Sequence, residues 1–391
     1  MALVHPVLAL ALVILAGIGV TRLSRPAFRH PALLTDLIAT GVPFLLLGLL
    51  LGPGLGVIDA EGLRMLEPLI VLAIGWTGAV FGAHLEWRMV RRISARTWLV
   101  GATLALPVLV VTTVMAVTVA RALPPLAEVW GRPLLPAALV LGGALTTAAS
   151  QRGPRLGRRN ALLDTAFGAG AVTLGVALYH PHVALRSLAL TLVAGLALGG
   201  LFVALARNEL LSEPRDAGIA AFAVILCGAG FSYVAGLSPF VLCGLEAAVF
   251  MSFSPATVRR AVAGLLSRCE GPLYATFLIV AGALLRPLTA WLLLAAPVLA
   301  LLRVLVRWVT VRFGLDQVDP VWRSLPFAPP PAFAHSVIRQ GATAVALAAG
   351  FDLIRGAPGP MLVTVLVSVM AADALALVHP LTARPRPAEV T

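Results

Sequence analysis

Long apolar segments constrain the fold of this sequence more than any other feature. Hydrophobic residues make up 60% of its 391 residues, charged residues only 12%, and the mean hydropathy is +0.97. Soluble domains are far less apolar. A segment that crosses a bilayer needs about 20 mostly apolar residues, and in lipid a helix satisfies its backbone hydrogen bonds internally. The sequence therefore predicts an all-α membrane protein.

Thirteen apolar segments are candidate transmembrane helices. They cover approximately residues 6–22, 33–52, 66–85, 98–120, 134–150, 160–179, 185–206, 217–236, 238–253, 271–285, 288–311, 335–352 and 360–379. The polar connections between them are short, and the longest runs from 312 to 334. We therefore expect a single transmembrane domain over residues 1–391.

The arginines indicate how the chain crosses the membrane. All 29 basic residues are Arg, and the formal net charge is +12. Loops after odd-numbered spans, together with the C-terminal tail, hold twenty arginines, and the opposite loops hold six. Because basic loops stay in the cytoplasm, we expect the N-terminus outside and the C-terminus in the cytoplasm. Arginines spread over many short loops also argue against a nucleic-acid partner.

Several short segments carry a family resemblance. GLLLGPGLGVI at 48–58 closes an early helix, and GAHLEWRMVRR at 82–92 leads from the next span into a basic loop. ALTTAA at 144–149 and ALLDT at 161–165 flank a second basic loop, and GLSP follows at 236–239. In this order they resemble the monovalent cation:proton antiporter superfamily, in particular its bacterial branch of sodium/proton and potassium-efflux antiporters.

The resemblance implies an architecture of two inverted repeats, in which helices 1–6 match helices 8–13. Residues 1–93 with 216–286 would form a scaffold that dimerises, and 97–180 with 288–380 would form the ion-transporting core. The segment 184–206 would be the linker helix. Short, interrupted apolar segments at matching places in two halves mark a transporter site. The fifth and twelfth helices fit that description, so we expect them to be broken and to cross.

Asp164 is the predicted ion- and proton-binding residue. The resemblance gives the carboxylate this role, with Thr146 and Thr147 of the broken fifth helix as further ligands. A charge within a span is costly unless it is paired or hydrated, which is a physical reason to expect a function. The alternative is a carboxylate that only stabilises the N-terminus of a helix.

Two arginines of the eleventh helix are candidate partners of Asp164. The resemblance makes Arg303 the counter-charge, because the family has a lysine or arginine at this place. Arg303 lies roughly 13 Å from Arg312 along the helix axis, which puts it near the middle of the membrane. Arg307, one turn nearer the cytoplasm, is the competing choice, and the alternative role for it is an interfacial anchor. Arg339, Gln340 and Thr343 are predicted to support the break of the twelfth helix.

Other polar residues receive no role from the pattern. These are His84, which stands where the family commonly has an acid, and Glu246, Asp352 and Asp373, which interrupt apolar runs. Leu163 stands where the family usually has Asn, Gln or Asp. The three cysteines are not spaced like a metal site, and the chain has no lysine for a phosphate-binding loop. We therefore expect no cofactor and no resident metal.

Together these features predict a secondary transporter and not an enzyme. It would exchange Na⁺ or K⁺ for H⁺ by alternating access, electroneutrally, as a homodimer in the inner membrane of the cell. Electroneutrality follows from Leu163, which leaves Asp164 as a single titrating carboxyl, and from arginine, which does not release its proton. The alternative is a relative that has lost transport and acts as a membrane sensor or a channel-like protein.

Overall fold

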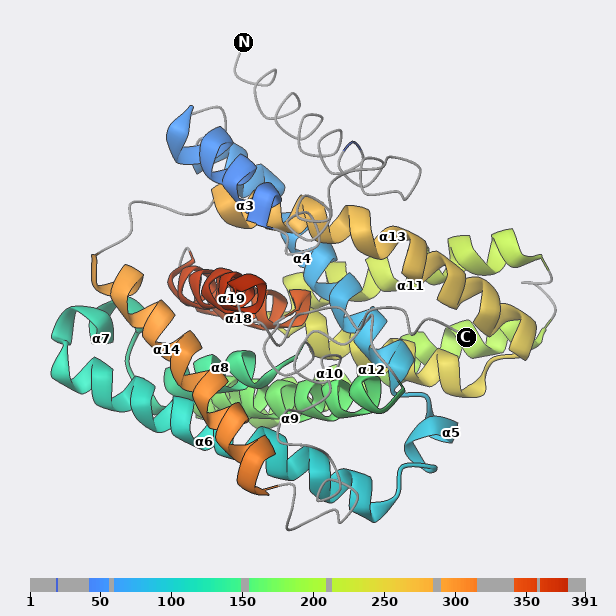
Figure 1. Cartoon of the computed structure of the whole chain (residues 1–391). Coiled ribbons are helices and arrows are strands. Elements are labelled where there is room, and N and C mark those ends of the chain that lie inside the picture. Colours follow the sequence, from blue (N-terminus) through green and yellow to red (C-terminus); the bar gives the residue numbers. More distant parts are fainter. Residues whose placement is uncertain are drawn as a thin grey trace, which may run out of the picture. The chain divides into compact units, whose positions relative to one another are not determined.

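The computed structural model describes residues 19, 42–55, 60–148, 155–208, 213–283, 290–314, 341–356 and 359–378. Every described element is helical (Figure 1). The elements are α3 (Val42–Leu49), η1 (Leu50–Gly54), α4 (Ala60–His84), α5 (Trp87–Val90), α6 (Ala95–Ala122), α7 (Pro124–Trp130), α8 (Leu134–Thr146), α9 (Arg155–Tyr179), α10 (Pro181–Arg207), α11 (Pro214–Val234), α12 (Pro239–Phe253), α13 (Ala256–Ala283), α14 (Ala290–Val309), η2 (Thr310–Gly314), α18 (Ala342–Arg355) and α19 (Pro360–Val378).

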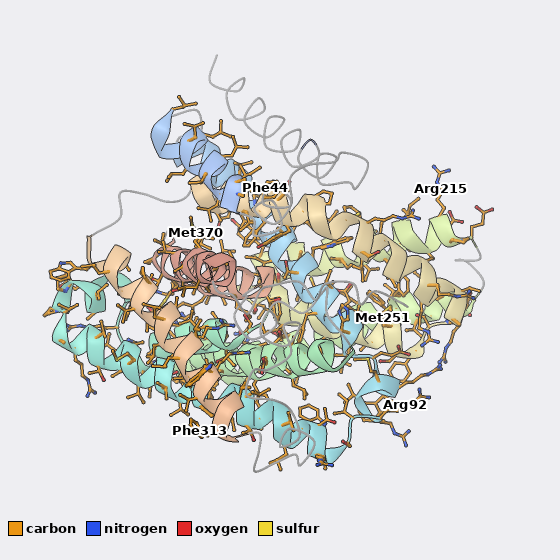
Figure 2. All side chains as sticks on the ribbon, viewed as in Figure 1. Phe44, Arg92, Arg215, Met251, Phe313 and Met370 are labelled. Atoms are coloured by element: carbon orange, nitrogen blue, oxygen red, sulfur yellow. The ribbon has the colours of Figure 1, made fainter. Side chains whose placement is uncertain are left out.

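Several helices are long enough to cross a membrane. Within the described residues, five are sufficiently long and apolar, and these are Leu66–His84, Ala95–Ala122, Ala161–Tyr179, Pro181–Arg207 and Pro214–Val234. The pair α7 and α8, bent by 76° at its break, makes a sixth if it counts as one span. The predicted span 6–22 lies almost entirely outside the described residues, and the predicted span 33–52 is described from residue 42 onward, as α3 and η1. Exposed arginines such as Arg92 and Arg215 project from the ends of helices (Figure 2).

Local sequence signals explain where several helices begin. Ser94 caps α6, because its side chain accepts a hydrogen bond from the N–H of Thr97 at 3.2 Å. α7, α11 and α12 each begin with a proline, whose missing N–H costs nothing in the first turn. Ser238 precedes α12 and caps it in the same way as Ser94 caps α6.

One predicted boundary is wrong. The expected helix 271–285 begins at Ala256, so α13 is 28 residues long. Its arginines suggested a loop, but the helix continues through them because Val258, Val262 and Leu266 form a buried stripe with a spacing of four residues. The short helix α7 was also not expected from the sequence.

The chain divides into two compact units. The first comprises residues 1–90, 185–288 and 352–359, and the second comprises 91–184, 289–351 and 360–391. The segment 184–206, predicted as a separate linker, belongs almost entirely to the first unit.

Close helix crossings over glycine hold the first unit together. Gly78 and Gly82 of α4 face the backbone of α12, where a side chain at either position would collide with the carbonyl oxygen of Phe240 or Gly244. α3 and α13 cross in the same way at Gly48 and Gly282. Such contacts replace the hydrophobic driving force that lipid does not supply between helices.

Close helix contacts over glycine also occur in the second unit, around α8. A side chain at Gly143 would lie 2.6 Å from the carbonyl oxygen of Gly168 in α9, and one at Gly168 would lie 2.9 Å from Cγ2 of Thr147. α14 packs against α6 and α19, and the Ser368 hydroxyl donates to the carbonyl of Ala296 at 2.9 Å. The end of α8 is thereby held beside the first half of α9.

Candidate ion-binding site

Asp164 lies in the apolar interior of the second unit. It is on α9, and only 2% of its surface is exposed. Its neighbours Leu162, Leu163 and Thr165 are buried as well. An isolated carboxylate in such surroundings costs several kcal/mol, so it needs a positive partner or a proton.

Arg307 of α14 is that partner. Its Nη1 lies 2.7 Å from Oδ2 of Asp164, and the two side chains are 1% and 2% exposed. The Nη2 atom of the same guanidinium donates to the carbonyl oxygen of Thr146. One arginine therefore links the carboxylate of α9 to the end of α8.

Arg303, one turn earlier on α14, binds the same helix end. Its Nε donates to the carbonyl of Leu145 at 2.6 Å, and its Nη2 donates to the carbonyl of Thr147 at 3.1 Å. α8 ends at Thr146, and Thr147 is extended with φ −61° and ψ 148°. The last carbonyls of a helix lack partners within the helix, so the two guanidinium groups satisfy three consecutive ones.

The sequence predicted Arg303 as the counter-charge of Asp164, with Arg307 as the competing choice. Arg307 makes the ion pair, while Arg303 bonds to backbone carbonyls, although it also acts on Asp164 electrostatically. The two residues are four apart on one helix and share one buried face, with exposures of 0% and 1%. The sequence indicated two arginines as possible partners of Asp164. It could not decide between them, because the choice depends on how far α9 is shifted along α14.

The two predicted threonine ligands lie at this helix end. Both side chains are fully buried, and each hydroxyl donates to its own helix: Thr146 to the carbonyl of Gly142 at 2.8 Å, and Thr147 to that of Ala144 at 2.9 Å. A hydroxyl that donates its proton keeps lone pairs for a cation. The backbone carbonyls of this turn are the additional oxygens that sequence reasoning did not single out.

Two buried polar atoms of the ion pair have no hydrogen-bond partner among the described residues. They are Oδ1 of Asp164 and Nε of Arg307. A carboxylate oxygen left in this way can accept a proton or ligate a hard cation. The site thus combines a held carboxylate oxygen, a second oxygen without a protein partner and a set of carbonyl dipoles.

The remaining predicted residues lie apart from this cluster or outside the described residues. Arg339 and Gln340 are outside them, and Thr343, near the start of α18, is partly exposed. Leu163 packs on α6, where a side chain at Gly101 would lie 2.6 Å from its Cδ1. Residues 149–154 and 335–340, which would include much of the expected helix crossing, also lie outside the described residues.

The structure describes the side chains of three of the four polar residues to which the sequence gave no role. The His84 ring Nδ1 lies 2.7 Å from the carbonyl of Val80 in its own helix. Glu246 and Asp352 are buried and belong to the first unit. The side chain of Asp373 is outside the described residues.

No profile of a known protein family matches this sequence, and no curated protein is similar to it in sequence. In structure the chain is similar to the sodium proton antiporter MjNhaP1 from Methanocaldococcus jannaschii at pH 8. The TM-score is 0.62, with 14% sequence identity and coverage of 96% of each chain. The chain has the fold of a sodium proton antiporter.

The antiporter fold confirms the predicted all-α membrane class and agrees with the family resemblance carried by the short segments of sequence. It is a transporter fold and not that of an enzyme. Within this fold, the buried Asp164, the terminus of α8 and the arginines of α14 form the most highly charged cluster of the second unit's described interior.

We predict that Arg307→Gln lowers the free energy of unfolding by about 3–5 kcal/mol, because it leaves a buried carboxylate without its counter-charge. Thermal unfolding of the purified protein in detergent measures the loss. The double variant Arg307→Gln/Asp164→Asn should regain part of it, since the carboxylate that lost its counter-charge is then replaced by a neutral amide.

Arg303→Gln is the matched control, one turn away on the same buried face. It removes hydrogen bonds to the carbonyls of Leu145 and Thr147 and leaves the ion pair intact. Its effect should therefore change less when Asp164→Asn is added. Stronger coupling of Asp164 to Arg303 than to Arg307 would show that the pair is wrongly assigned.

Proposed function

We propose that this protein exchanges a monovalent cation for protons across a membrane, with Asp164 as the shared binding residue. The observation that carries the proposal is the buried carboxylate itself. One of its oxygens is held by Arg307, and the other lacks a protein partner among the described residues. The antiporter fold supports the same conclusion.

Competition at one carboxylate is sufficient for exchange. A proton and a dehydrated cation both neutralise Asp164, so binding of one excludes the other. When neither is bound, Arg307 supplies the neutralising charge and keeps the charged carboxylate tolerable in the interior. If the site is exposed alternately to the two sides, each crossing carries either the proton or the cation.

The carbonyls at the end of α8 supply the remaining ligands in this proposal. Those of Leu145, Thr146 and Thr147 accept hydrogen bonds from the two arginines. A cation that binds Asp164 would release Arg307 from the carboxylate and from Thr146, freeing two oxygens at once. Carboxylate, carbonyl and hydroxyl oxygens are the ligands that hard cations prefer.

The setting of this exchange is also proposed. Sodium is the first cation to test, because the similar structure is that of a sodium proton antiporter, and potassium is the second. The second unit, with Asp164, would be the moving core, and the first unit would be the scaffold of a homodimer. The protein would lie in the inner membrane with its N-terminus outside.

A transport-inactive sensor is the second candidate. The observation that favours it is the tight pair of Asp164 and Arg307, with Leu163 in place of a second polar ligand. A pair that never opened would bind no cation. Cation-driven proton flux separates the two functions, because an inactive relative would show none.

We predict that Asp164→Asn abolishes sodium-driven proton flux in proteoliposomes, because an amide cannot exchange a proton for a cation. Potassium is tested in parallel. Asp216→Asn is the control, since Asp216 is an exposed carboxylate in the first turn of α11. Full flux in the Asp164 variant would remove this residue from the mechanism.

We also predict that transport is electroneutral. Leu163 is apolar and 1% exposed, so Asp164 has no acidic neighbour in the preceding position, and arginine does not deprotonate. One proton is then exchanged for one cation. Sodium-driven proton flux should therefore stay constant when potassium and valinomycin clamp the membrane potential at different values. A reversal point that moves with voltage would mean that a second group carries protons.

The arginine bias predicts that residues 152–159 face the cytoplasm. Single cysteines placed there, in a variant without the three native cysteines, should resist an impermeant thiol reagent in intact cells and react after permeabilisation. Cysteines placed between residues 121 and 132 should react in both conditions. The opposite pattern would reverse the proposed orientation.

A further inference from the structure

Glu246 is a second deeply buried carboxyl, and it lies in the first unit. It is on α12 and has an exposed fraction of 0%. Neither carboxyl oxygen has a hydrogen-bond partner among the described residues. This distinguishes it from Asp164, which is paired with Arg307.

The carboxyl group fits into a space that a glycine leaves open. A side chain at Gly228 of α11 would collide with Oε2 of Glu246, and the same point lies 3.0 Å from Cδ2 of Leu242 and 3.3 Å from Sγ of Cys243. On another side, a side chain at Gly199 of α10 would lie 2.8 Å from the carbonyl oxygen of Glu246. Three helices therefore enclose this residue.

Within the part of the chain that the structure describes, the surrounding helices provide no counter-charge to Glu246. Cys243 on α12 is a titratable neighbour of Glu246, and its thiol lies 3.6 Å from the carbonyl of Ile225. Cys227 of α11 interacts electrostatically with Cys243. The other described titratable or charged side chains of α4, α10 and α11 lie toward the ends of these helices, and they are Glu67, His84, His182, Arg186, Arg207, Tyr233, Arg215 and Asp216. Among the described residues none forms an ion pair or a hydrogen bond with Glu246.

We propose that Glu246 is a second proton-binding site, which holds its proton as a neutral carboxylic acid at neutral pH. A carboxylate enclosed by glycine, leucine and a thiol, with no positive partner, would carry the full penalty of burial. A bound proton removes that penalty. The site goes beyond the exchange proposed for Asp164 and does not depend on it, because its evidence lies wholly within the first unit.

Loss of this proton would destabilise the first unit. Below the pH at which Glu246 ionises, the acid is neutral and the packing of α10, α11 and α12 is intact. Above that pH a charge lies against Gly228 and must be hydrated, which requires these helices to separate. Stability should therefore fall as the pH rises above the range in which a glutamate of the unfolded chain ionises, and the fall should end once Glu246 ionises in the folded protein.

Infrared spectroscopy of the full-length protein in lipid tests the protonation state directly. At neutral pH we expect the carbonyl stretching band of a protonated carboxylic acid, shifted in D₂O, and its loss in Glu246→Gln. Glu86→Gln is the matched control in the same unit, because Glu86 is paired with Arg259 and only partly buried. A band of equal size in wild type and Glu246→Gln would overturn the proposal.

A second measurement does not depend on that band, and a third tests where the acid lies. The melting temperature of the wild type should fall more steeply toward alkaline pH than that of Glu246→Gln, and parallel profiles would contradict the proposal. Gly228→Ala should shift the band by displacing the carboxyl group. Gly230→Ala, on the same helix with no atom within 4 Å of the added methyl group, should not. Identical spectra for both glycine variants would show that the acid does not lie against Gly228.

Discussion

The buried ion pair of Asp164 and Arg307 is the constraint on which the rest of the second unit depends. Removing two charges from water costs several kcal/mol for each, and their attraction compensates only when the geometry is close and the remaining polar atoms are bonded. Here one guanidinium bonds to both the carboxylate and a backbone carbonyl, while Oδ1 of Asp164 and Nε of Arg307 have no hydrogen-bond partner among the described residues. The arginines of α14 therefore depend on the carbonyls at the C-terminal end of α8, and these carbonyls depend on the arginines for hydrogen bonds.

Glycine contacts bring the partners of that pair together. Gly168 is one turn beyond Asp164 on α9, and it lies against Gly143 and Thr147 of α8. A larger residue at either glycine would separate the helices by the width of a side chain, and the end of α8 would move away from the carboxylate. These two glycines thus set the distances of the charged site.

The sequence predicted the kind of site better than its details. Apolar runs indicated most of the helices, and the family resemblance, together with the cost of a charge in an apolar run, singled out Asp164 and two candidate arginine partners. Arg307 could not be distinguished from Arg303, because both lie on one face and the relative height of two helices depends on tertiary packing. The contact between Gly228 and Glu246 could not be predicted either, because it depends on the alignment of α11 with α12. The start of α13 was missed because arginine is common both in loops and in helices.

The two buried carboxyls show opposite solutions to the same physical problem. Asp164 of α9 lies beside the end of another helix, α8, so carbonyl dipoles and guanidinium groups are available and the charged form can be stabilised without a proton. Glu246 lies within an unbroken helix whose carbonyls bond to their own N–H groups, with glycines as neighbours. No dipole there can be redirected toward a charge. A carboxyl that must exchange its proton for a cation needs the first environment, because the cation requires oxygens that an intact helix cannot give. In the proposed exchange, the end of α8 beside Asp164 is therefore what would let Asp164, and not Glu246, bind both ions.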